Sequence, residues 1–567
     1  MKLDALLMLQ RSDIAHFVRD PAAYAGLMLI FIDPGTVDEA VNQGVDSARF
    51  DYRPLDVGRH LQARVTAEAM NRAQALDRLL YRERVKLFGQ GEFQGWDVSV
   101  SRLFFVRALM ARELGAICDR SFSESSIGVF RPTRPQQFYF DSFVTTDLFI
   151  AGSPRWKVVD HYDTTLNWVE DSNASCFDFD QIERRAAAGA AQAVTHIPTV
   201  YAQLRHYARE MAQTFSSSID LPSPFWDIPL QRDRSPLVRI DSVASRFLGD
   251  ECRTYRERAR QVIEAQLRDL LTHPHALQSQ VDLMVDRCFM QAVNYQGLSV
   301  ALKESQPHFV LTEHDTGSIG PLFTVASQLG SHITVLPHSS YPTELLPHST
   351  RVVAIERDGF AAPVRTVWGE LVATRPVRFA PRKQMLERPH VATVCLLLNT
   401  MFSQGISHVD LVGLAGFHKA LSELCAARGV RLLVRLKPNA AGVMIASGAL
   451  GVPVAELQAV LAASLEEIAT ASDLCVAYGE PTTASIEFME AGSCLMQVCD
   501  QYWPAGYLSC APYLTAASVP FLSGADALPV IDRLLADAAH FRTVAGRQRQ
   551  ELAARFTAVD GRIFDAR

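Results

Sequence analysis

The stretch SDLCVAYGEPTTASIEFMEAG, residues 472–492, decides the fold of the last third of this 567-residue chain. Residues 473–477 are typical of a buried strand, a polar loop follows, and residues 483–491 have the pattern of a short helix. The first backbone N–H groups of such a helix lack partners within it, and they lie at the positive end of the helix dipole. This strand, loop and helix therefore predict a site for a phosphate or another anion.

Two side chains near this loop suit the ribose and the phosphates of a nucleotide. Glu487 lies one turn inside the predicted helix, where its carboxylate can accept hydrogen bonds from ribose hydroxyls. Lys437 follows a strand over residues 431–436, which we expect to be the neighbouring strand, and it can balance phosphate charge. The same loop also suits a purely structural role, since every α/β domain contains such units. Two polar strand ends together favour the binding site.

The order of predicted elements indicates the architecture. From residue 391 onward strands and helices alternate, which predicts a doubly wound parallel sheet. A proline-containing linker precedes it, so we predict an N-terminal domain of residues 1–375 and a C-terminal domain of residues 376–567. The first 150 residues have the pattern of an α/β unit, and an almost wholly helical pattern predicts an insertion at about residues 180–305.

Composition excludes several classes of protein. The net charge is −7 and there is no block of Lys and Arg, which argues against a nucleic-acid partner. None of the ten cysteines forms a C-x-x-C pair, so neither a zinc site nor a disulfide scaffold is expected. The early apolar run at residues 25–32 is too short to span a bilayer, and the N-terminus lacks the features of a secretory signal. We therefore expect a cytoplasmic protein.

The N-terminal half offers candidates for a general base. Glu313, His314 and Asp315 follow a predicted strand directly, and His338 follows the next one. Polar groups at the carboxyl ends of parallel strands face the ligand crevice, where a carboxylate or an imidazole can take a proton from a hydroxyl nucleophile. Asp315 also suits a helix cap, and His338 also suits a loop histidine bonded to backbone.

These motifs carry a family resemblance. From residue 391 to residue 567 the chain resembles the GT-B glycosyltransferases, in which two Rossmann-like domains face each other across a cleft. Residues 472–492 resemble the donor-nucleotide loop and helix of that class. The segment RLLVRLKPN, residues 431–439, resembles a strand that in bacterial polysaccharide transferases often ends in His-Pro, with Lys437 in place of the His. The Lys-Pro and Thr-Thr segments are similar to capsule and lipopolysaccharide transferases, including CMP-sugar-dependent Kdo and sialic acid enzymes.

The resemblance implies an α/β fold of two Rossmann-like doubly wound domains facing a cleft, with a large helical insertion in the N-terminal half. It implies transfer of a sugar from a nucleotide-sugar donor to a hydroxyl of a glycan or lipid-linked acceptor, in bacterial surface polysaccharide assembly. It implies a base from Glu313 or Asp315, while Glu480 and Glu487 do not have the E-x7-E spacing of many retaining enzymes. The residues expected to contact the donor nucleotide are Lys437, Asn439, Gly479, Glu480, Thr482, Thr483, Ser485 and Glu487.

Further expectations concern cofactors, partners and location. Enzymes of this class hold the phosphates with helix N-termini and basic side chains, so the resemblance implies neither a metal nor another cofactor. The expected partners are the nucleotide-sugar and the acceptor, with at most peripheral membrane association at the inner face of the membrane. Two alternatives stay open, namely a nucleotide-sugar 2-epimerase of the same fold and a non-catalytic partner subunit.

Overall fold

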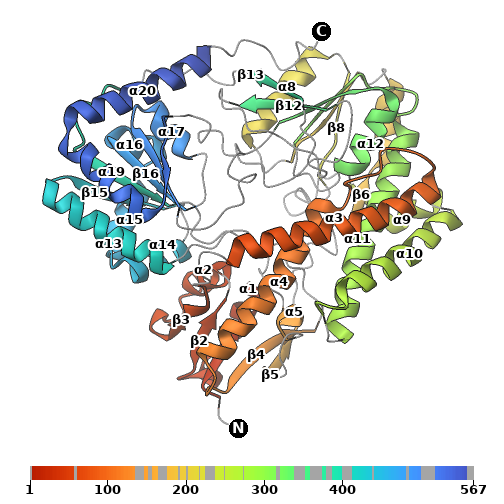
Figure 1. The fold of residues 1–567 in the computed structure, drawn as a ribbon. Helices are drawn as coiled ribbons and strands as arrows, with labels where there is room; N and C mark the ends of the chain where they lie inside the picture. The colour runs from red at the N-terminus through yellow and green to blue at the C-terminus, as the bar shows by residue number, and fades with distance from the viewer. Residues whose placement is uncertain are drawn as a thin grey trace.

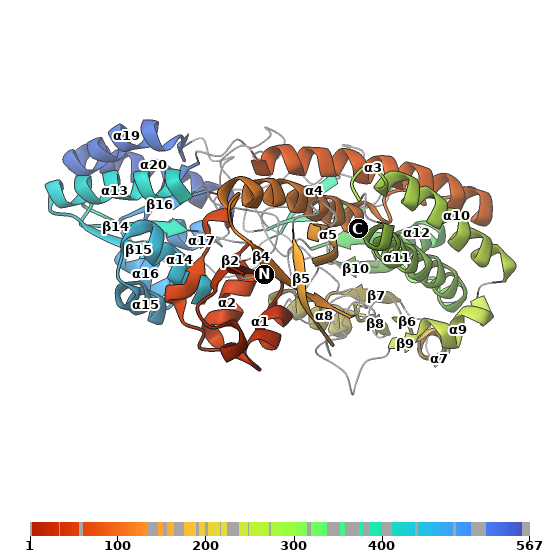
Figure 2. The same ribbon diagram turned by 90° about the horizontal axis from the view of Figure 1, so that it is seen from below.

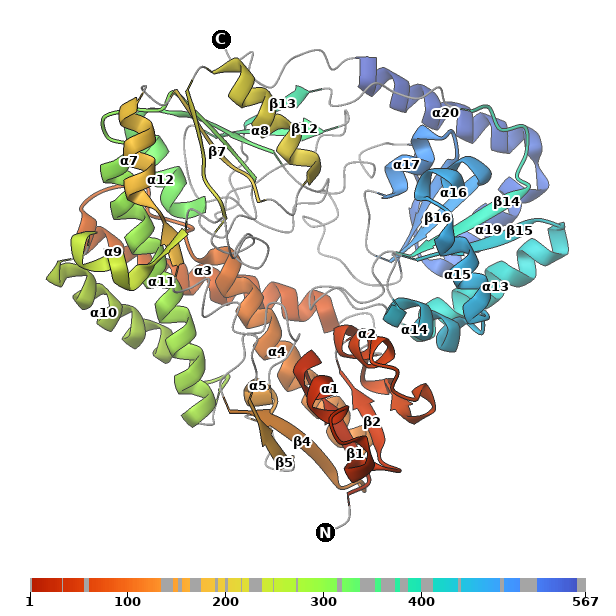
Figure 3. The same cartoon turned by 180° about the vertical axis from the view of Figure 1, so that it is seen from behind.

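The structure is a computed structural model of the chain. Figure 1 shows the fold, and Figure 3 shows it from behind. The residues described are 3–32, 34–55, 61–133, 146–150, 156–163, 175–188, 192–198, 202–215, 217–223, 237–247, 249–271, 274–313, 319–336, 352–357, 373–377, 386–398, 411–436, 440–479, 484–499 and 518–557.

The first of three parallel sheets has the strand order β3-β2-β1-β4-β5. Its strands are β1 (Ala5–Met8), β2 (Met28–Phe31), β3 (Phe50–Asp51), β4 (Ile127–Pro132) and β5 (Lys157–Tyr162). Its helices are α1 (Arg11–Phe17), α2 (Pro34–Asn42), α3 (Leu61–Phe88), α4 (Val98–Ser121) and α5 (Thr146–Ile150). Side chains alternate along the central strand β1, so Leu7 packs against the long helices and Leu6 packs in a second core on the other face.

The second sheet has the order β13-β12-β11-β10-β7-β8, again with all neighbours parallel. Its strands are β7 (Ala193–His196), β8 (Ser218–Asp220), β10 (Phe309–Thr312), β11 (His332–Val335), β12 (Val352–Arg357) and β13 (Ala373–Val377). A small antiparallel pair, β6 (Ser175–Phe177) and β9 (Leu237–Arg239), lies beside it. The helices of this region are α7 (Phe179–Ala188), α8 (Ala202–Thr214), α9 (Ile240–Phe247), α10 (Asp250–Leu267), α11 (Pro274–Ala301) and α12 (Ile319–Leu329).

The third sheet has the order β15-β14-β16-β17-β18, and all of its pairs are parallel. Its strands are β14 (Thr393–Leu398), β15 (Arg431–Arg435), β16 (Leu474–Tyr478), β17 (Cys494–Val498) and β18 (Phe521–Leu522). Its helices are α13 (Leu411–Arg428), α14 (Ala440–Leu450), α15 (Val454–Ala462), α16 (Leu465–Ala471), α17 (Ala484–Glu490), α19 (Gly524–Ala536) and α20 (Ala538–Thr557). Both faces of β14 and β16 are buried, as expected for a sheet with helices on both sides.

The first and third sheets share one hydrophobic core. Leu6 and Met8 of the first sheet belong to the same buried cluster as Val394 and Leu396 of the third. Helices α2 and α14 lie side by side between the two sheets (Figures 1 and 2). The approach is close at Gly448, where a Cβ atom would lie 2.2 Å from the hydroxyl of Tyr52. The N-terminal unit therefore braces the C-terminal one.

A buried ion network fixes the start of the helical layer. Arg84 is fully buried and donates hydrogen bonds of 2.8 Å to Asp77 and 2.7 Å to Asp97. Its Nε donates to the carbonyl of Phe93 at 2.9 Å, and its guanidinium lies over the ring of Trp96. Burial raises the pKa of Asp97, and the neighbouring guanidinium opposes that shift. The network joins α3 to the segment that precedes α4.

The structure confirms the predicted α/β class and the doubly wound parallel sheets. Residues 1–375 contain two sheets rather than one. The first sheet is built around β1, a strand that the sequence analysis did not recognise. The predicted helical region at 180–305 contains α7 to α11, yet it also contains β7, β8 and β9, so the expectation of helices almost alone was wrong there. These strands have three or four residues, too few to show a period.

Among the described residues, no helix is long and apolar enough to cross a membrane. Eight of the nine cysteines in the described ranges, all except Cys252, are described with their side chains, and these eight are buried and not in disulfides.

Candidate functional site

The third sheet contains a topological switch point between β14 and β16. Numbered along the chain its strands run 2-1-3-4-5, so the connection from β14 to β15 and the connection from β15 to β16 run in opposite directions. In such sheets a crevice opens at the carboxyl ends of the two strands where the order reverses, and ligands bind there. Leu398 pairs with Tyr478 at that edge. The loop predicted to bind the nucleotide therefore begins at the switch point.

Gly479 opens that loop and is conformationally required. Its φ is +87°, a region that L-residues with a side chain rarely adopt. No heavy atom lies within 4 Å of the position that a Cβ would take, so the backbone angle alone favours glycine. Its N–H donates to the carbonyl of Val498 at 2.8 Å, which ties the turn to the next strand.

Gln497 holds the turn at Gly479, and the sequence analysis missed it. Its fully buried amide donates to the carbonyls of Gly479 at 2.9 Å and Ala477 at 3.1 Å. A buried amide on a strand of otherwise apolar residues was the signal available in the sequence, CLMQV. The turn is thus held by β17 on the side away from β14.

Two of the predicted donor-binding residues, Ser485 and Glu487, lie on different faces of helix α17. Ser485 is fully buried, and its hydroxyl has no hydrogen-bond partner in the structure as described. Glu487 is exposed in the first turn. Residues two apart on a helix point to different faces, so the structure does not bring these side chains together. Of these two side chains, Glu487 is the one exposed to solvent.

The expected adjacency of the Lys437 strand was wrong. β15, which precedes Lys437, pairs with β14, and β14 lies between β15 and β16. The chain passes from β15 across β14 to β16, so the strand before Lys437 and the strand before Gly479 are not neighbours. Arg435, the last residue of β15, donates to carbonyls of α15 and its following turn at 2.7 and 3.0 Å. Burial lowers the pKa of Arg435, and these bonds engage the guanidinium away from a ligand.

The second sheet has the same winding. Its strands run 2-1-3-4-5-6, with the switch point between β7 and β10. Glu313 follows β10 at that edge and is fully buried. The backbone N–H of Glu313 and the hydroxyl of Thr312 both donate to the carbonyl of His196, at 3.3 and 3.1 Å. The end of β7 therefore fixes the segment that carries the predicted base.

His196 is a second residue that the sequence analysis missed. Its ring is fully buried, and its Nδ1 lies 3.1 Å from the carbonyl of Leu221, which fixes the proton on Nδ1 because a carbonyl only accepts. Val194 faces the core beside α11, whereas Leu311 faces the core beside α8. By strand alternation His196 shares the first face and Glu313 the second, so their side chains diverge.

The two edges share one region of the molecule. In Figures 1 and 3 the arrowheads of β12 and β13 and those of the third sheet point toward the middle. The remaining predicted site residues lie outside the described ranges: His314, Asp315, His338, Lys437, Asn439, Glu480, Thr482 and Thr483. Within the described ranges, no group of three His, Cys, Asp or Glu side chains is placed to hold a metal ion.

The first sheet carries a polar cluster at its own switch point, between β1 and β4. Tyr162 donates to Asp13 at 2.7 Å and lies 2.8 Å from the hydroxyl of Ser12. The other carboxylate oxygen of Asp13 accepts from the backbone of Leu9 and Gln10. These buried groups bond to one another, as expected of a structural network at a sheet edge.

Comparisons with known proteins add little. No family model and no curated protein matches the chain. Among solved structures, the glycosyltransferase SsfS6 of Streptomyces sp. SF2575 is 14% identical, covers 64% of this chain and 96% of its own, and has a TM-score of 0.28. SnogD of Streptomyces nogalater is 13% identical, with coverage of 64% and 95% and a TM-score of 0.32. The spinosyn forosaminyltransferase SpnP is 13% identical, with coverage of 64% and 95% and a TM-score of 0.33. Similarities this low support no argument about the activity of this chain.

Proposed function

We propose that this protein is a glycosyltransferase that takes a sugar from a nucleotide-sugar donor and transfers it to a hydroxyl of a glycan acceptor. The observation that carries the proposal is the pair of like-wound sheets. The second and third sheets both run 2-1-3-4-5 through their first five strands. Each has a switch point at a carboxyl edge, and the arrowheads of both sheets point toward the middle of the molecule.

In this proposal the third sheet binds the nucleotide. The tight turn at Gly479 lets the backbone approach a diphosphate or monophosphate closely, and exposed Glu487 accepts hydrogen bonds from ribose hydroxyls. The predicted contacts from Lys437, Thr482 and Thr483 supply charge and hydroxyl groups around the phosphate. The donor base is left open, and a CMP-sugar such as a Kdo or sialic acid donor is one candidate.

The second sheet then presents the acceptor and the base. The acceptor hydroxyl oxygen attacks the anomeric carbon, the bond from that carbon to the phosphate oxygen breaks, and the nucleotide leaves with the bonding electron pair. The hydroxyl proton passes to a base from Glu313, His314 or Asp315, or to His338. The carbonyl of His196 accepts from the Glu313 N–H and the Thr312 hydroxyl, which fixes the start of that segment at the end of β10. We place the acceptor among bacterial surface glycans, free or lipid-linked.

A thermal-shift screen against UDP, GDP, CMP, CDP, dTDP and ADP tests the donor side. A nucleotide that binds only the folded protein raises the melting temperature in proportion to the logarithm of its concentration over Kd. One nucleotide should give a clear shift, and its sugar derivative should then release nucleotide only with an acceptor present. Release without any acceptor would instead favour the epimerase reading, and no shift with any nucleotide would overturn the proposal.

A further inference from the structure

Two fixed ends bound the stretch that carries three of the candidate bases. It runs from Glu313, directly after β10, to Ile319, the first residue of α12. General-base catalysis needs the base within hydrogen-bond reach of the attacking hydroxyl. The contacts that hold these two ends therefore limit where the base can lie.

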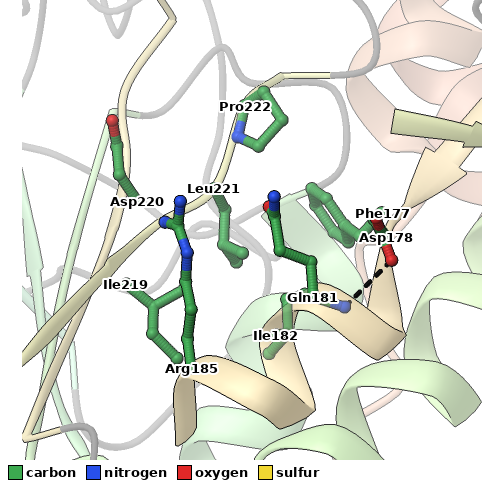
Figure 4. A pocket seen from close by; sticks show the side chains of 9 residues that line it. All are labelled: Phe177, Asp178, Gln181, Ile182, Arg185, Ile219, Asp220, Leu221 and Pro222. Carbon is green, nitrogen blue, oxygen red and sulfur yellow. Dashed lines mark hydrogen bonds between the residues drawn. The ribbon is translucent and has the colours of Figure 1, made fainter. Parts of the chain in front are cut away.

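The first end is held by the end of β7. The backbone N–H of Glu313 donates to the carbonyl of His196 at 3.3 Å. The ring of His196 is fixed in turn, since its Nδ1 lies 3.1 Å from the carbonyl of Leu221. Leu221 follows β8 and lines the small pocket drawn in Figure 4. These contacts lie at the strand ends, and the start of α12 depends on others.

The second end is held by Trp96, in the segment that precedes α4. The indole N–H of Trp96 donates to the hydroxyl oxygen of Thr324 on α12 at 2.9 Å. That hydroxyl donates in turn to the carbonyl of Glu92 at 2.7 Å. The side chains of Trp96 and Thr324 are buried, with exposed fractions of 3% and 1%. Two hydrogen bonds in series therefore link α12 to the segment before α4.

Gly320 lets the first turn of α12 lie directly on Trp96. It comes one helical turn before Thr324, so the two residues share one face of the helix. A Cβ atom at this position would lie 2.7 Å from Cδ1 and 2.8 Å from Cα of Trp96. The Cα atom belongs to the backbone and cannot turn aside, so a larger residue would push the start of α12 away. The close approach therefore requires glycine here.

The segment that carries Trp96 is itself held by the buried ion network. Nε of Arg84 donates to the carbonyl of Phe93, and the guanidinium lies over the ring of Trp96, 5.0 Å from its centroid. Asp77 accepts from the backbone N–H of Gly95 at 2.8 Å. The rings of Phe93 and Trp96 pack edge to face, with their centroids 5.8 Å apart. Trp96 therefore gives α12 a rigid support.

We propose that Trp96 is a positioning residue for the sugar transfer, because it fixes the first turn of α12 and so the end of the stretch that carries the base. The inference rests on the proposed function and adds to it a residue from outside the second sheet. Trp96 lies between α3 and α4, two helices of the first sheet. It acts through α12 and needs no contact with a substrate, so it should affect the rate of transfer and not the binding of the donor.

Amide hydrogen exchange, read by mass spectrometry, tests the placement of α12. Trp96→Phe keeps an aromatic ring and removes the N–H that bonds to Thr324. Exchange in peptides covering residues 319–326 should become about fivefold faster, the factor that corresponds to one hydrogen bond of typical strength. Thr324→Val should have the same effect, whereas Thr324→Ser keeps a hydroxyl and should exchange as the wild type does.

Ser331→Ala is the matched control. It removes a fully buried hydroxyl that donates to the carbonyl of Pro307, just beyond the other end of α12. It should lower stability in urea about as much as Trp96→Phe does, and it should leave exchange at residues 319–326 unchanged. Exchange there that is equal in Trp96→Phe and Ser331→Ala, or in Trp96→Phe and the wild type, would overturn the placement of α12 by Trp96.

The rate of transfer tests the role of Trp96 in the reaction. The probes are the nucleotide-sugar of the nucleotide that the screen selects, with methyl glycosides of glucose, galactose and N-acetylglucosamine as acceptors. Trp96→Phe should lower kcat by about tenfold or more and leave KM for the donor unchanged, because a small displacement of a catalytic group slows the step. Thr324→Ser and Ser331→Ala should keep the wild-type kcat. A wild-type kcat in Trp96→Phe, or a loss as large in Ser331→Ala, would overturn the positioning role.

The nucleotide thermal shift on the same samples separates this inference from the function that it rests on. Equal shifts and equal kcat in the wild type and Trp96→Phe overturn the positioning role and leave the transferase intact. No shift with any nucleotide removes the transferase, and the role of Trp96 in transfer with it, whatever the exchange at α12.

Discussion

The side-chain amide of Gln497 donates a hydrogen bond of 2.9 Å to the carbonyl oxygen of Gly479. This bond joins strand β17 to the turn that follows strand β16. The turn lies at the edge of the sheet where the strand order reverses. The turn is therefore set by the sheet before any nucleotide arrives, and the first predictions concern how the turn is held.

Replacing Gly479 by alanine should destabilise the protein by about 1–2 kcal/mol, because the residue has φ +87° and an L side chain disfavours that region. Nothing within 4 Å would clash with the added methyl group, so the effect should be conformational. Urea denaturation measures it. The matched control is Gly416→Ala at an exposed, unobstructed position of α13, which should be neutral or stabilising. Equal stability of Gly479→Ala and wild type would contradict the strain at the turn.

Replacing Gln497 by leucine should cost about 1–3 kcal/mol of folding stability, because carbonyls at the end of β16 lose a buried donor. The variant should also bind the nucleotide more weakly. Gln548→Leu is the control, since that buried amide bonds to Leu495 near the opposite end of β17. Denaturation and nucleotide titration together check this. A loss of nucleotide affinity as large in Gln548→Leu as in Gln497→Leu would show that the effect is general destabilisation.

Replacing Glu487 by alanine should weaken nucleotide binding by about 1–3 kcal/mol through lost charge-assisted hydrogen bonds, with unchanged folding stability because the side chain is exposed. Isothermal titration with the nucleotide chosen by the screen measures it. Glu423→Ala, an exposed carboxylate on α13, controls for the change in net charge. Identical affinities in wild type and Glu487→Ala would remove the proposed ribose contact.

Replacing Arg84 by methionine should destabilise the fold by about 3–5 kcal/mol, because Asp77 and Asp97 would be left buried without their cation. Thermal and urea unfolding measure this change. The control Arg82→Met alters an exposed position on the same helix and should shift stability by less than about 0.5 kcal/mol. Similar values for the two variants would contradict a structural role for the ion network.

The third sheet could be predicted from the sequence because its elements are long and regular. β15, β16 and α17 each begin and end within one residue of the bounds predicted for them, 431–436, 473–477 and 483–491. Residues 454–471 form two helices, α15 and α16, because Ser464 caps the second one with a capping box to Glu467. The strand order could not be predicted from the sequence. Both β14 and β15 are apolar strands, and either of them could pair with β16 without changing the pattern of apolar residues.

The residues of the candidate site could be predicted only in part, because some of them act through contacts between distant parts of the chain. Gly479 and Glu313 follow regular buried strands, and the structure places both at switch points. His196 and Gln497 act through long-range hydrogen bonds, and nothing local in the sequence marks the partner of such a bond. β1 was missed because four apolar residues fit a buried strand and a buried helix equally well.

The most direct test of the central claim is amide hydrogen exchange, read by mass spectrometry, with and without the nucleotide that gives the largest thermal shift. If the nucleotide binds at the switch point of the third sheet, exchange should slow in peptides covering residues 396–412 and 476–490. Peptides covering residues 5–18, at the corresponding edge of the first sheet, should exchange as before. Protection at the first sheet with none at β14 and β16 would contradict the assignment of the donor site.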